Sequence, residues 1–160
     1  MSPLNILWND AFQNILHEFE PGFRILTKEN SKEIIHNSYN WIRDNLKELL
    51  KSSAKSINFT TDLWTSHQND SYISVTISWI DQKMQLHKAL IGIELLPNSH
   101  TSENIKNNLN TILENWNLKD KCFATTTDNG TNVKKAISLM NRVENIRCAA
   151  HHYIFLLQKA

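Results

Sequence analysis

The stretch from Ile57 to Trp64, which reads INFTTDLW, alternates largely between apolar and polar residues and so has the period of a β-strand. Asp62 and Trp64 fall on one face of this strand. The other face carries Ile57, Phe59, Thr61 and Leu63. Similar runs follow at residues 72–80 and 86–96, and the links between the runs are short and polar. The three runs are therefore predicted to form an antiparallel meander.

The alternation also predicts which side chains of the second and third strands share a face. Ile73, Val75, Ile77 and Trp79 lie on one face of the second run, and serines and threonines lie on its opposite face. In the third run, Ala89, Ile91, Ile93 and Leu95 are expected on one face together.

Apolar residues spaced three and four positions apart predict helices before and after the meander. Ser31 is the expected N-cap of the second helix. The predicted helices cover residues 4–19, 31–51, 100–116, 131–140 and 151–160, and two further strands cover 121–128 and 146–150. This order indicates a mixed α/β protein with a five-stranded sheet and helices on its faces. Residues 1–54 would form an N-terminal helical segment, and residues 55–160 the domain that contains the sheet.

Composition restricts the class of protein. Hydrophobic residues make up 41% and charged residues 21% of the 160 residues, which supports a packed core. The net charge is +1, so any DNA contact has to come from local patches rather than from an overall basic surface. The sequence shows no apolar run of membrane-spanning length and no signal-peptide pattern. Two cysteines, Cys122 and Cys148, favour a reducing intracellular compartment over a disulfide framework.

Two aspartates lie at or near the ends of predicted strands. Asp62 lies near the end of the first strand and Asp128 at the end of the fourth. If these strands are parallel neighbours, both carboxylates emerge at the same edge of the sheet, where ligand sites are common. Close carboxylates repel each other unless cations neutralise them, and hard ions such as Mg²⁺ prefer oxygen ligands. The pair is thus a candidate site for metal-assisted phosphodiester cleavage.

A structural role for both aspartates is the alternative. Asp128-Asn129-Gly130 is a strong turn sequence, and Asp128 could cap the helix that begins near Thr131. Asp62 could accept backbone hydrogen bonds from the loop that follows it. Carboxylates at turns are often structural, so spacing alone leaves both interpretations open.

Several blocks of this sequence together resemble the hAT superfamily of DNA transposases, in their ribonuclease H-like catalytic domain. The same domain occurs in BED-finger transposase-derived proteins. The resemblance covers about residues 10 to 160. Its blocks are Thr60-Thr61-Asp62-Leu63-Trp64-Thr65-Ser66 with Tyr72, then His100-Thr101-Ser102-Glu103-Asn104-Ile105, Thr127-Asp128-Asn129-Gly130-Thr131-Asn132 and Cys148-Ala149-Ala150-His151.

The resemblance implies a ribonuclease H-like fold in which the first and fourth strands are parallel neighbours. Asp62 and Asp128 would be the first two catalytic carboxylates and would bind Mg²⁺ or Mn²⁺. Cys148 and His151 match the family's Cys-x-x-His signature, whose histidine is thought to help place the DNA. Lys28 keeps a positive charge where the family usually has Pro-Ser-Arg. The implied partner is DNA at transposon ends, and the implied location is the nucleus.

The sequence also departs from the family pattern. The third catalytic carboxylate, a glutamate beyond a helical insertion, has no counterpart up to Ala160, and none of the chain's own glutamates is assigned to replace it. The N-terminal BED zinc finger is likewise not represented. We therefore expect weak metal binding and no transposition by this chain alone.

Other residues have weaker claims to a functional role. Cys148 and His151 could be half of a zinc site, but structural zinc needs four ligands, so none is expected. Trp64 either borders the carboxylate site or covers the edge of the sheet. The pair Lys134-Lys135 could contact phosphates, although solvated lysines are more common. Core packing is expected for Trp41, Trp79 and Trp116.

A non-catalytic role is the alternative function. The chain would then be a transposase-derived module that binds DNA or protein. The apolar run Tyr153–Leu157 in the last predicted helix would be exposed, which favours association with another copy or with a C-terminal portion of a longer protein.

Overall fold

The structure is a computed structural model and describes residues 4–96, 100–128 and 130–148. Contacts divide the chain into two compact units, Met1–Glu48 and Leu49–Ala160. The long helix α2, Lys28–Ser53, contributes to both units. Among the described residues, none of the helices is both long enough and apolar enough to cross a bilayer.

The N-terminal unit begins with a short 3₁₀ helix, η1 (Leu4–Trp8), followed by α1 (Asp10–Phe19). The prediction of one continuous helix over residues 4–19 is therefore wrong. Asn9 has an extended backbone, with φ −81° and ψ 126°, and its side-chain oxygen accepts a hydrogen bond from the N–H of Phe12 at 3.3 Å. An asparagine bonded in this way starts a new helix instead of continuing the previous one.

Helix α2 begins three residues earlier than predicted because Thr27, and not Ser31, caps it. Oγ1 of Thr27 accepts a hydrogen bond from the N–H of Asn30 at 3.2 Å. The expectation that Trp41 packs in a core is also wrong, since its side chain is 70% exposed. Leu50 is the buried residue of α2, and it lies at the end that belongs to the C-terminal unit.

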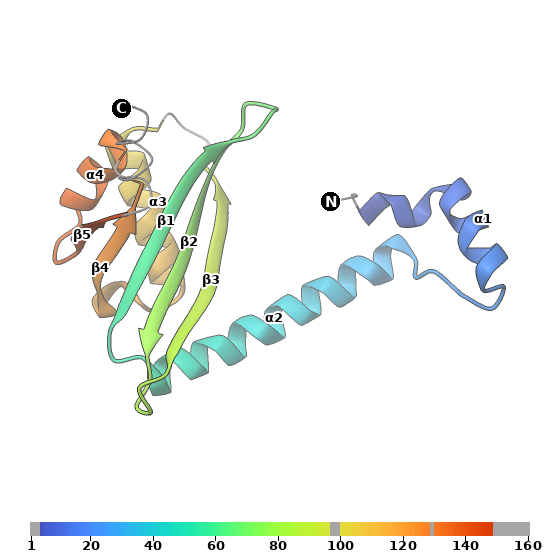
Figure 1. Cartoon of the computed structure of the whole chain (residues 1–160), viewed down its shortest axis with the longest axis horizontal. Coiled ribbons are helices and arrows are strands. Elements are labelled where there is room, and N and C mark those ends of the chain that lie inside the picture. The colour runs from blue at the N-terminus through green and yellow to red at the C-terminus, as the bar shows by residue number, and fades with distance from the viewer. Residues whose placement is uncertain (1–3, 97–99, 129, 149–160) are drawn as a thin grey trace, which may run out of the picture. The chain divides into compact units, whose positions relative to one another are not determined.

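The C-terminal unit is built on a five-stranded mixed sheet with the strand order β3-β2-β1-β4-β5, shown in Figure 1. The strands β1, β2 and β3 form the predicted antiparallel meander, and β4 and β5 add parallel to it through β1. This topology confirms the predicted fold class. The strands are β1 (Ile57–Thr65), β2 (Ser71–Ile80), β3 (Leu86–Leu95), β4 (Cys122–Thr127) and β5 (Glu144–Arg147).

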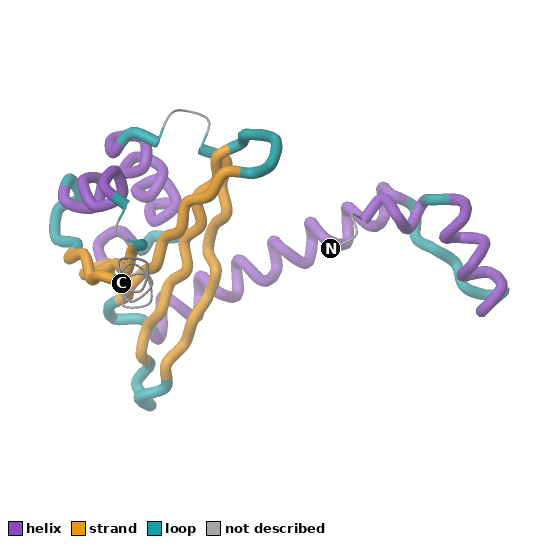
Figure 2. Tube along the Cα trace, turned by 45° about the horizontal axis from the view of Figure 1, so that its top comes forward, coloured by secondary structure: helices purple, strands orange, loops and turns teal. Residues whose placement is uncertain are grey.

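Two helices, α3 (Ser102–Asn115) and α4 (Thr131–Ser138), lie on one side of the sheet, as Figures 1 and 2 show. We call the opposite side the outer face. The short 3₁₀ helix η2 (Lys119–Lys121) leads into β4. The fully buried large side chains of this core are Leu50, Ile57, Phe59, Ile73, Val75, Ile77, Ile105, Leu109, Ile112, Leu113, Leu118 and Ile137.

Long-range polar contacts fasten this core. The side-chain amine of Lys121 donates hydrogen bonds to the carbonyls of Leu50 at 3.1 Å and Ala54 at 2.7 Å, which satisfies carbonyls at the end of α2. The indole of Trp116 donates to the carbonyl of Ile91 at 2.8 Å. Trp116 and Trp79 are buried, which confirms their expected packing.

A β-bulge corrects the prediction for the third strand. Val75 pairs with Gly92 and Thr76 pairs with Leu90, so Ile91 is the extra residue. The side-chain alternation therefore shifts by one position after the bulge. Ile93 and Leu95, which we expected on the same face as Ala89 and Ile91, are instead 56% and 49% exposed on the outer face. Alternation along a sequence cannot show such a shift, because the pairing with the neighbouring strand defines it.

The fifth strand is also shifted. It covers Glu144–Arg147 and not residues 146–150, because its pairing begins with Ala124 opposite Glu144. The last two residues of the predicted strand and the whole predicted helix 151–160 lie outside the described residues.

Candidate functional site

The parallel pairing of β1 and β4 brings the strand segments that lead to the two aspartates together. The ladder pairs Asn58 with Ala124, Phe59 with Thr125, and Thr60 with Thr126. The same offset, continued for two residues, brings Asp128 alongside Asp62. Neighbouring strands lie about 4.8 Å apart, so strands paired with this offset would bring both aspartates to the same end of the sheet.

Asp62 projects from the outer face of the sheet. Its neighbour Thr61 is buried, whereas Asp62 is exposed and pairs with Ser74 on β2. Within the described part of the chain, no hydrogen bond or ion pair engages the Asp62 carboxylate. In particular, the loop over residues 65–71 is closed by the hydroxyl of Ser66, so Asp62 does not accept the backbone bonds of that loop. The structural alternative for Asp62 is therefore wrong.

Asp128 has one oxygen committed to a turn. Its Oδ1 accepts a hydrogen bond from the N–H of Gly130 at 2.9 Å. The N-cap of α4 is Gly130 itself, with no side-chain hydrogen bond, so Asp128 organises the turn before the helix without occupying the cap position. A Cβ atom at Gly130 would lie 3.3 Å from Oδ1 of Asp128. The absence of a side chain at Gly130 therefore allows the Asp128 carboxylate to stay where it is.

The donor set fits a hard divalent cation only in part. Two carboxylates supply oxygen ligands, which Mg²⁺ and Mn²⁺ prefer, and one of the four oxygens is already bonded to Gly130. Among the described residues, no group of three or more histidine, cysteine, aspartate or glutamate side chains is close enough to hold a metal ion. The described residues therefore supply two carboxylates, which are only some of the ligands that a divalent cation needs.

An aromatic pair lies beside the carboxylates. Trp64 and Tyr72 are cross-strand partners, and their rings stack with centroids 5.7 Å apart and an angle of 17° between the planes. Trp64 is 39% exposed and lies two residues after Asp62, on the same face. Trp64 lies next to the end of β1, and its two predicted roles, beside the carboxylate site or over the end of the sheet, both stay predictions.

Buried threonines lie under the site, and of these the sequence interpretation had placed only Thr61 on an apolar face. Thr61, Thr125 and Thr127 are at most 3% exposed. Oγ1 of Thr127 donates to the side-chain oxygen of Asn145 at 3.2 Å, whereas Oγ1 of Thr61 and of Thr125 has no hydrogen-bond partner among the residues that the structure describes. The signal in the sequence was the run Thr125-Thr126-Thr127 before Asp128, in a strand where buried positions would usually be aliphatic.

The remaining predicted DNA contacts are placed only in part. Cys148 is half-buried, and its N–H bonds to the carbonyl of Thr127 at 3.2 Å, so it stands beside the end of β4. His151 lies outside the described residues. Lys28 is the first residue of α2 and belongs to the N-terminal unit. DNA contacts by these three residues stay predictions.

The other cysteine is not a ligand candidate. Cys122 begins β4 and is buried, and burial raises the pKa of its thiol to about 12. A thiol with such a pKa stays protonated at neutral pH, and it is the thiolate that binds metals.

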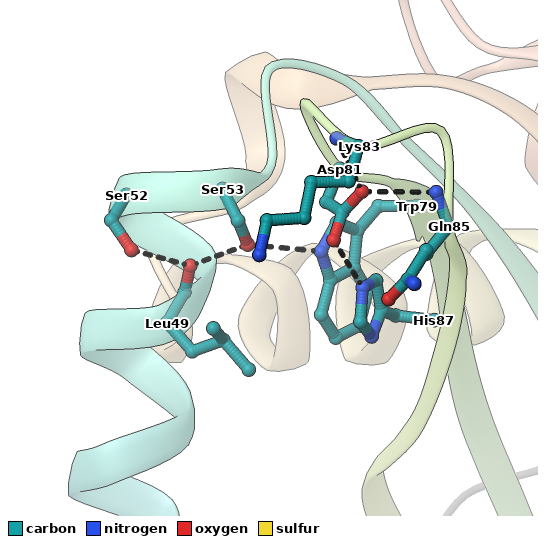
Figure 3. A network of polar contacts seen from close by, with 8 residues as sticks. All are labelled: Leu49, Ser52, Ser53, Trp79, Asp81, Lys83, Gln85 and His87. Atoms are coloured by element: carbon teal, nitrogen blue, oxygen red, sulfur yellow. Dashed lines mark hydrogen bonds and ion pairs between the residues drawn. The ribbon is translucent and has the colours of Figure 1, made fainter.

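A third strand-end aspartate has a different environment. Asp81 follows β2, at the opposite end of the sheet from Asp62, as the register of β1 and β2 requires. Its carboxylate accepts hydrogen bonds from the N–H groups of Lys83 at 2.8 Å and Gln85 at 2.9 Å, and lies 2.9 Å from Nε2 of His87 (Figure 3). These bonds, chiefly that with His87, lower the pKa of Asp81.

The same network continues into the core. His87 stacks on Trp79 with ring centroids 5.1 Å apart, and the indole N–H of Trp79 donates to Oγ of Ser53 at 3.0 Å. Figure 3 shows Asp81, His87 and Trp79 in one group facing the end of α2. The Asp81 network thus ties the β2–β3 hairpin to that helix end, and every oxygen of the carboxylate has a partner.

Comparison with known proteins identifies the family of this chain. The family of ZBED1 RNase-like domains matches residues 60–151, which include Asp62 and Asp128 and make up more than half of the chain. The matched segment begins in β1 and includes β2 to β5.

Plant proteins are among the similar sequences. The Putative AC transposase of Zea mays is 31% identical over 129 residues, which cover 81% of this chain and 16% of that protein. The Zinc finger BED domain-containing protein RICESLEEPER 3 of Oryza sativa subsp. japonica is 26% identical over 164 residues, or 93% of this chain and 22% of that protein. The chain thus spans about a fifth of the length of these relatives. Together with the mixed sheet, these matches show that the chain belongs to the ZBED1 RNase-like domain family, the ribonuclease H-like and hAT-type transposase-derived proteins.

Proposed function

We propose that Asp62 and Asp128 are the first two metal-binding carboxylates of a hAT-type transposase catalytic domain. The observation that supports this proposal is the parallel pairing of β1 with β4, whose offset, extended two residues beyond the last printed pair, would set Asp128 opposite Asp62. Bound between them, Mg²⁺ or Mn²⁺ would neutralise charge and activate oxygen during phosphodiester cleavage. The ancestral reaction is DNA strand cleavage and transfer at transposon ends, in the nucleus.

Each described residue has a distinct part in this proposal. Asp62 offers an exposed carboxylate with no described partner, and Asp128 offers a carboxylate oriented by Gly130. The stacked pair of Trp64 and Tyr72 presents an aromatic surface next to the carboxylates, against which a DNA base can stack. Cys148, His151 and Lys28 complete the proposed DNA contacts.

The 160 residues supply two acids where the proposed reaction uses three. We therefore expect them to bind a divalent ion weakly and to cut no DNA on their own, because an incompletely supported site lacks both affinity and geometry. A longer chain that supplies the third carboxylate would complete the site.

Metal binding tests the proposal directly. Electron paramagnetic resonance of Mn²⁺, titrated with the chain, should show binding that Asp62→Asn and Asp128→Asn each remove. Asp120→Asn is the matched control, since Asp120 is an exposed aspartate in η2. Equal Mn²⁺ binding by the wild-type chain and both site variants would contradict the proposal.

DNA cleavage tests the expected inactivity. Labelled transposon-end DNA, incubated with the chain and Mg²⁺ or Mn²⁺, should remain uncut. Specific cutting that disappears in Asp62→Asn would show that the two acids suffice, and the expectation of inactivity would then be wrong.

A second candidate function is a non-catalytic module that binds DNA or protein. The outer face favours it, because Leu90, Ile93 and Leu95 form an exposed apolar row on β3, on the same face of the sheet as Asp62 and separated from it by β2. Such a surface, together with the predicted run Tyr153–Leu157, suits another copy or a C-terminal portion of a longer protein. DNA binding that weakens steeply with salt would support the DNA part of this proposal, and no binding at low salt would reject it. Sedimentation would reveal self-association.

A further inference from the structure

His100 connects two elements that frame the carboxylate pair. Its imidazole Nε2 and the hydroxyl of Ser71 are hydrogen-bonded at 2.5 Å. Its backbone carbonyl accepts a hydrogen bond from the side-chain amide of Asn132 at 2.7 Å. The carbonyl of Ser71 also accepts the N–H of Leu96 at 2.7 Å, so Ser71 holds both ends of the connection between β3 and α3.

One side of this connection leads to Asp62. Ser71 is the first residue of β2 and pairs with Thr65 at the end of β1, three residues after Asp62. The hairpin between them is stiffened by Ser66, whose hydroxyl accepts hydrogen bonds from the N–H groups of Gln68 and Asp70. Ser71 is therefore fixed relative to the strand that carries Asp62.

The other side leads to Asp128. Asn132 is the second residue of α4, directly after the turn in which the N–H of Gly130 holds Oδ1 of Asp128. The amide of Asn132 anchors the start of α4 to the backbone of His100. The orientation of the Asp128 turn thus depends on the hydrogen bond between Asn132 and His100, a residue in the connection from β3 to α3.

We propose that His100 is a positioning residue that holds the Asp62 strand and the Asp128 turn in one geometry. The imidazole ring of His100 is hydrogen-bonded to Ser71, which is fixed to the Asp62 strand. The backbone carbonyl of His100 accepts a hydrogen bond from Asn132, which follows the Asp128 turn. A single residue therefore joins the strand and the turn. The part of the inference that concerns metal affinity rests on the proposed function. The part that concerns the geometry of the turn does not.

Metal affinity gives the first test. Outer-shell groups that orient metal ligands typically change affinity by 10–100-fold when they are lost, and we expect His100→Ala to weaken Mn²⁺ binding by about tenfold. His100→Gln should restore most of the affinity, because its terminal amide lies near the position of Nε2. His67→Ala is the control, since His67 is exposed in the hairpin of the same edge. Unchanged Mn²⁺ affinity in His100→Ala would overturn the inference.

A metal-free measurement separates this inference from the proposed function. The amide resonance of Gly130 reports its hydrogen bond to Asp128, and it should shift in His100→Ala and in Asn132→Asp but not in His67→Ala. If the wild-type chain binds no Mn²⁺ and the Gly130 resonance still shifts, the proposed metal site fails and the positioning role stands. If the resonance does not move in His100→Ala, the positioning role is wrong.

Discussion

Asp62 and Asp81 lie at opposite ends of the same sheet, and their surroundings differ in one decisive way. Asp81 has three hydrogen-bond partners, and the bond with His87 is the main cause of its lowered pKa. Asp62 projects from the outer face with no hydrogen-bond partner among the described residues. A carboxylate whose oxygens are all used stabilises the fold, whereas one that is left open beside a second carboxylate can bind a ligand.

The comparison also explains which local features separate a structural aspartate from a candidate site. Both residues end or nearly end a strand, and both are followed by short turns. In the hairpin after β2, the carboxylate of Asp81 accepts the hydrogen bonds of the turn N–H groups. In the hairpin after Asp62, the hydroxyl of Ser66 accepts the corresponding bonds. Because the hydroxyl of Ser66 accepts the N–H groups of the turn, the carboxylate of Asp62 is not needed to stabilise that turn.

Removing the open carboxylate of Asp62 should give the largest effect on metal binding. We expect Asp62→Asn to reduce Mn²⁺ affinity by at least about 100-fold, the upper end of what loss of an outer-shell group causes, since here a ligand itself is lost. Its stability should stay within about 0.5 kcal/mol of wild type, because Asp62 is exposed and makes no described bond. Mn²⁺ titration and thermal melting check both statements. A large drop in stability would place Asp62 in the same class as Asp81.

A change at Gly130 should affect the same site less strongly. In Gly130→Ala the new Cβ would press upon Oδ1 of Asp128 at 3.3 Å, a distance that requires the carboxylate to move. We expect Mn²⁺ affinity to fall by about tenfold, as for other changes that disturb ligand orientation. Gly22→Ala is the control, because its Cβ would meet one side-chain oxygen at an ordinary contact distance of 3.5 Å. Unaltered affinity in Gly130→Ala would mean that Asp128 need not hold this position.

The Asp81 network offers a matched pair of serine variants, both visible in Figure 3. Ser53→Ala removes the acceptor of the buried Trp79 N–H and should lower the free energy of unfolding by about 1–3 kcal/mol. Ser52→Ala removes an exposed hydroxyl that bonds only to the carbonyl of Leu49, and its effect should stay within about 0.5 kcal/mol. Chemical denaturation measures both. Equal effects would show that the Trp79 bond does not link the hairpin to α2.

The smallest effect concerns pH. Because the pKa of Asp81 is lowered from its usual 3.8, its stabilising contribution is fully present above that value and is lost as the pH falls through the lower folded-state pKa. Melting temperatures of wild type and Asp81→Asn should therefore differ at pH 6 and approach each other in acid. A difference that stays constant down to pH 2 would show that ionised Asp81 contributes nothing to stability.

Much of the fold could be predicted from local patterns. Alternation located β1, β2 and most of β3, and the spacing of apolar residues located α2, α3 and α4. The errors arose where one side chain changed the backbone locally: Asn9 divided the first predicted helix, and Thr27 started α2 early. Such capping bonds depend on single residues, and the pattern of apolar residues does not record them.

The two site aspartates could also be proposed from the sequence alone, because each lies at or near the end of a predicted strand and within a family motif. Their neighbours could not. The stacking of Trp64 on Tyr72 and the exposure of Leu95 follow from strand pairing and from the bulge at Ile91. His100 looked like the entrance to a helix, and its bonds to Ser71 and Asn132 join residues about 30 positions apart in the chain.

Residue types and their short-range spacing were therefore sufficient to recognise a mixed sheet, to assign its strands and to single out two acidic side chains. The alignment of those acids, the partners that occupy Asp81 and leave Asp62 open, and the link through His100 required the folded chain. The physical reason is that periodicity acts within one element, whereas register, bulges and hydrogen bonds between side chains arise only when distant segments meet.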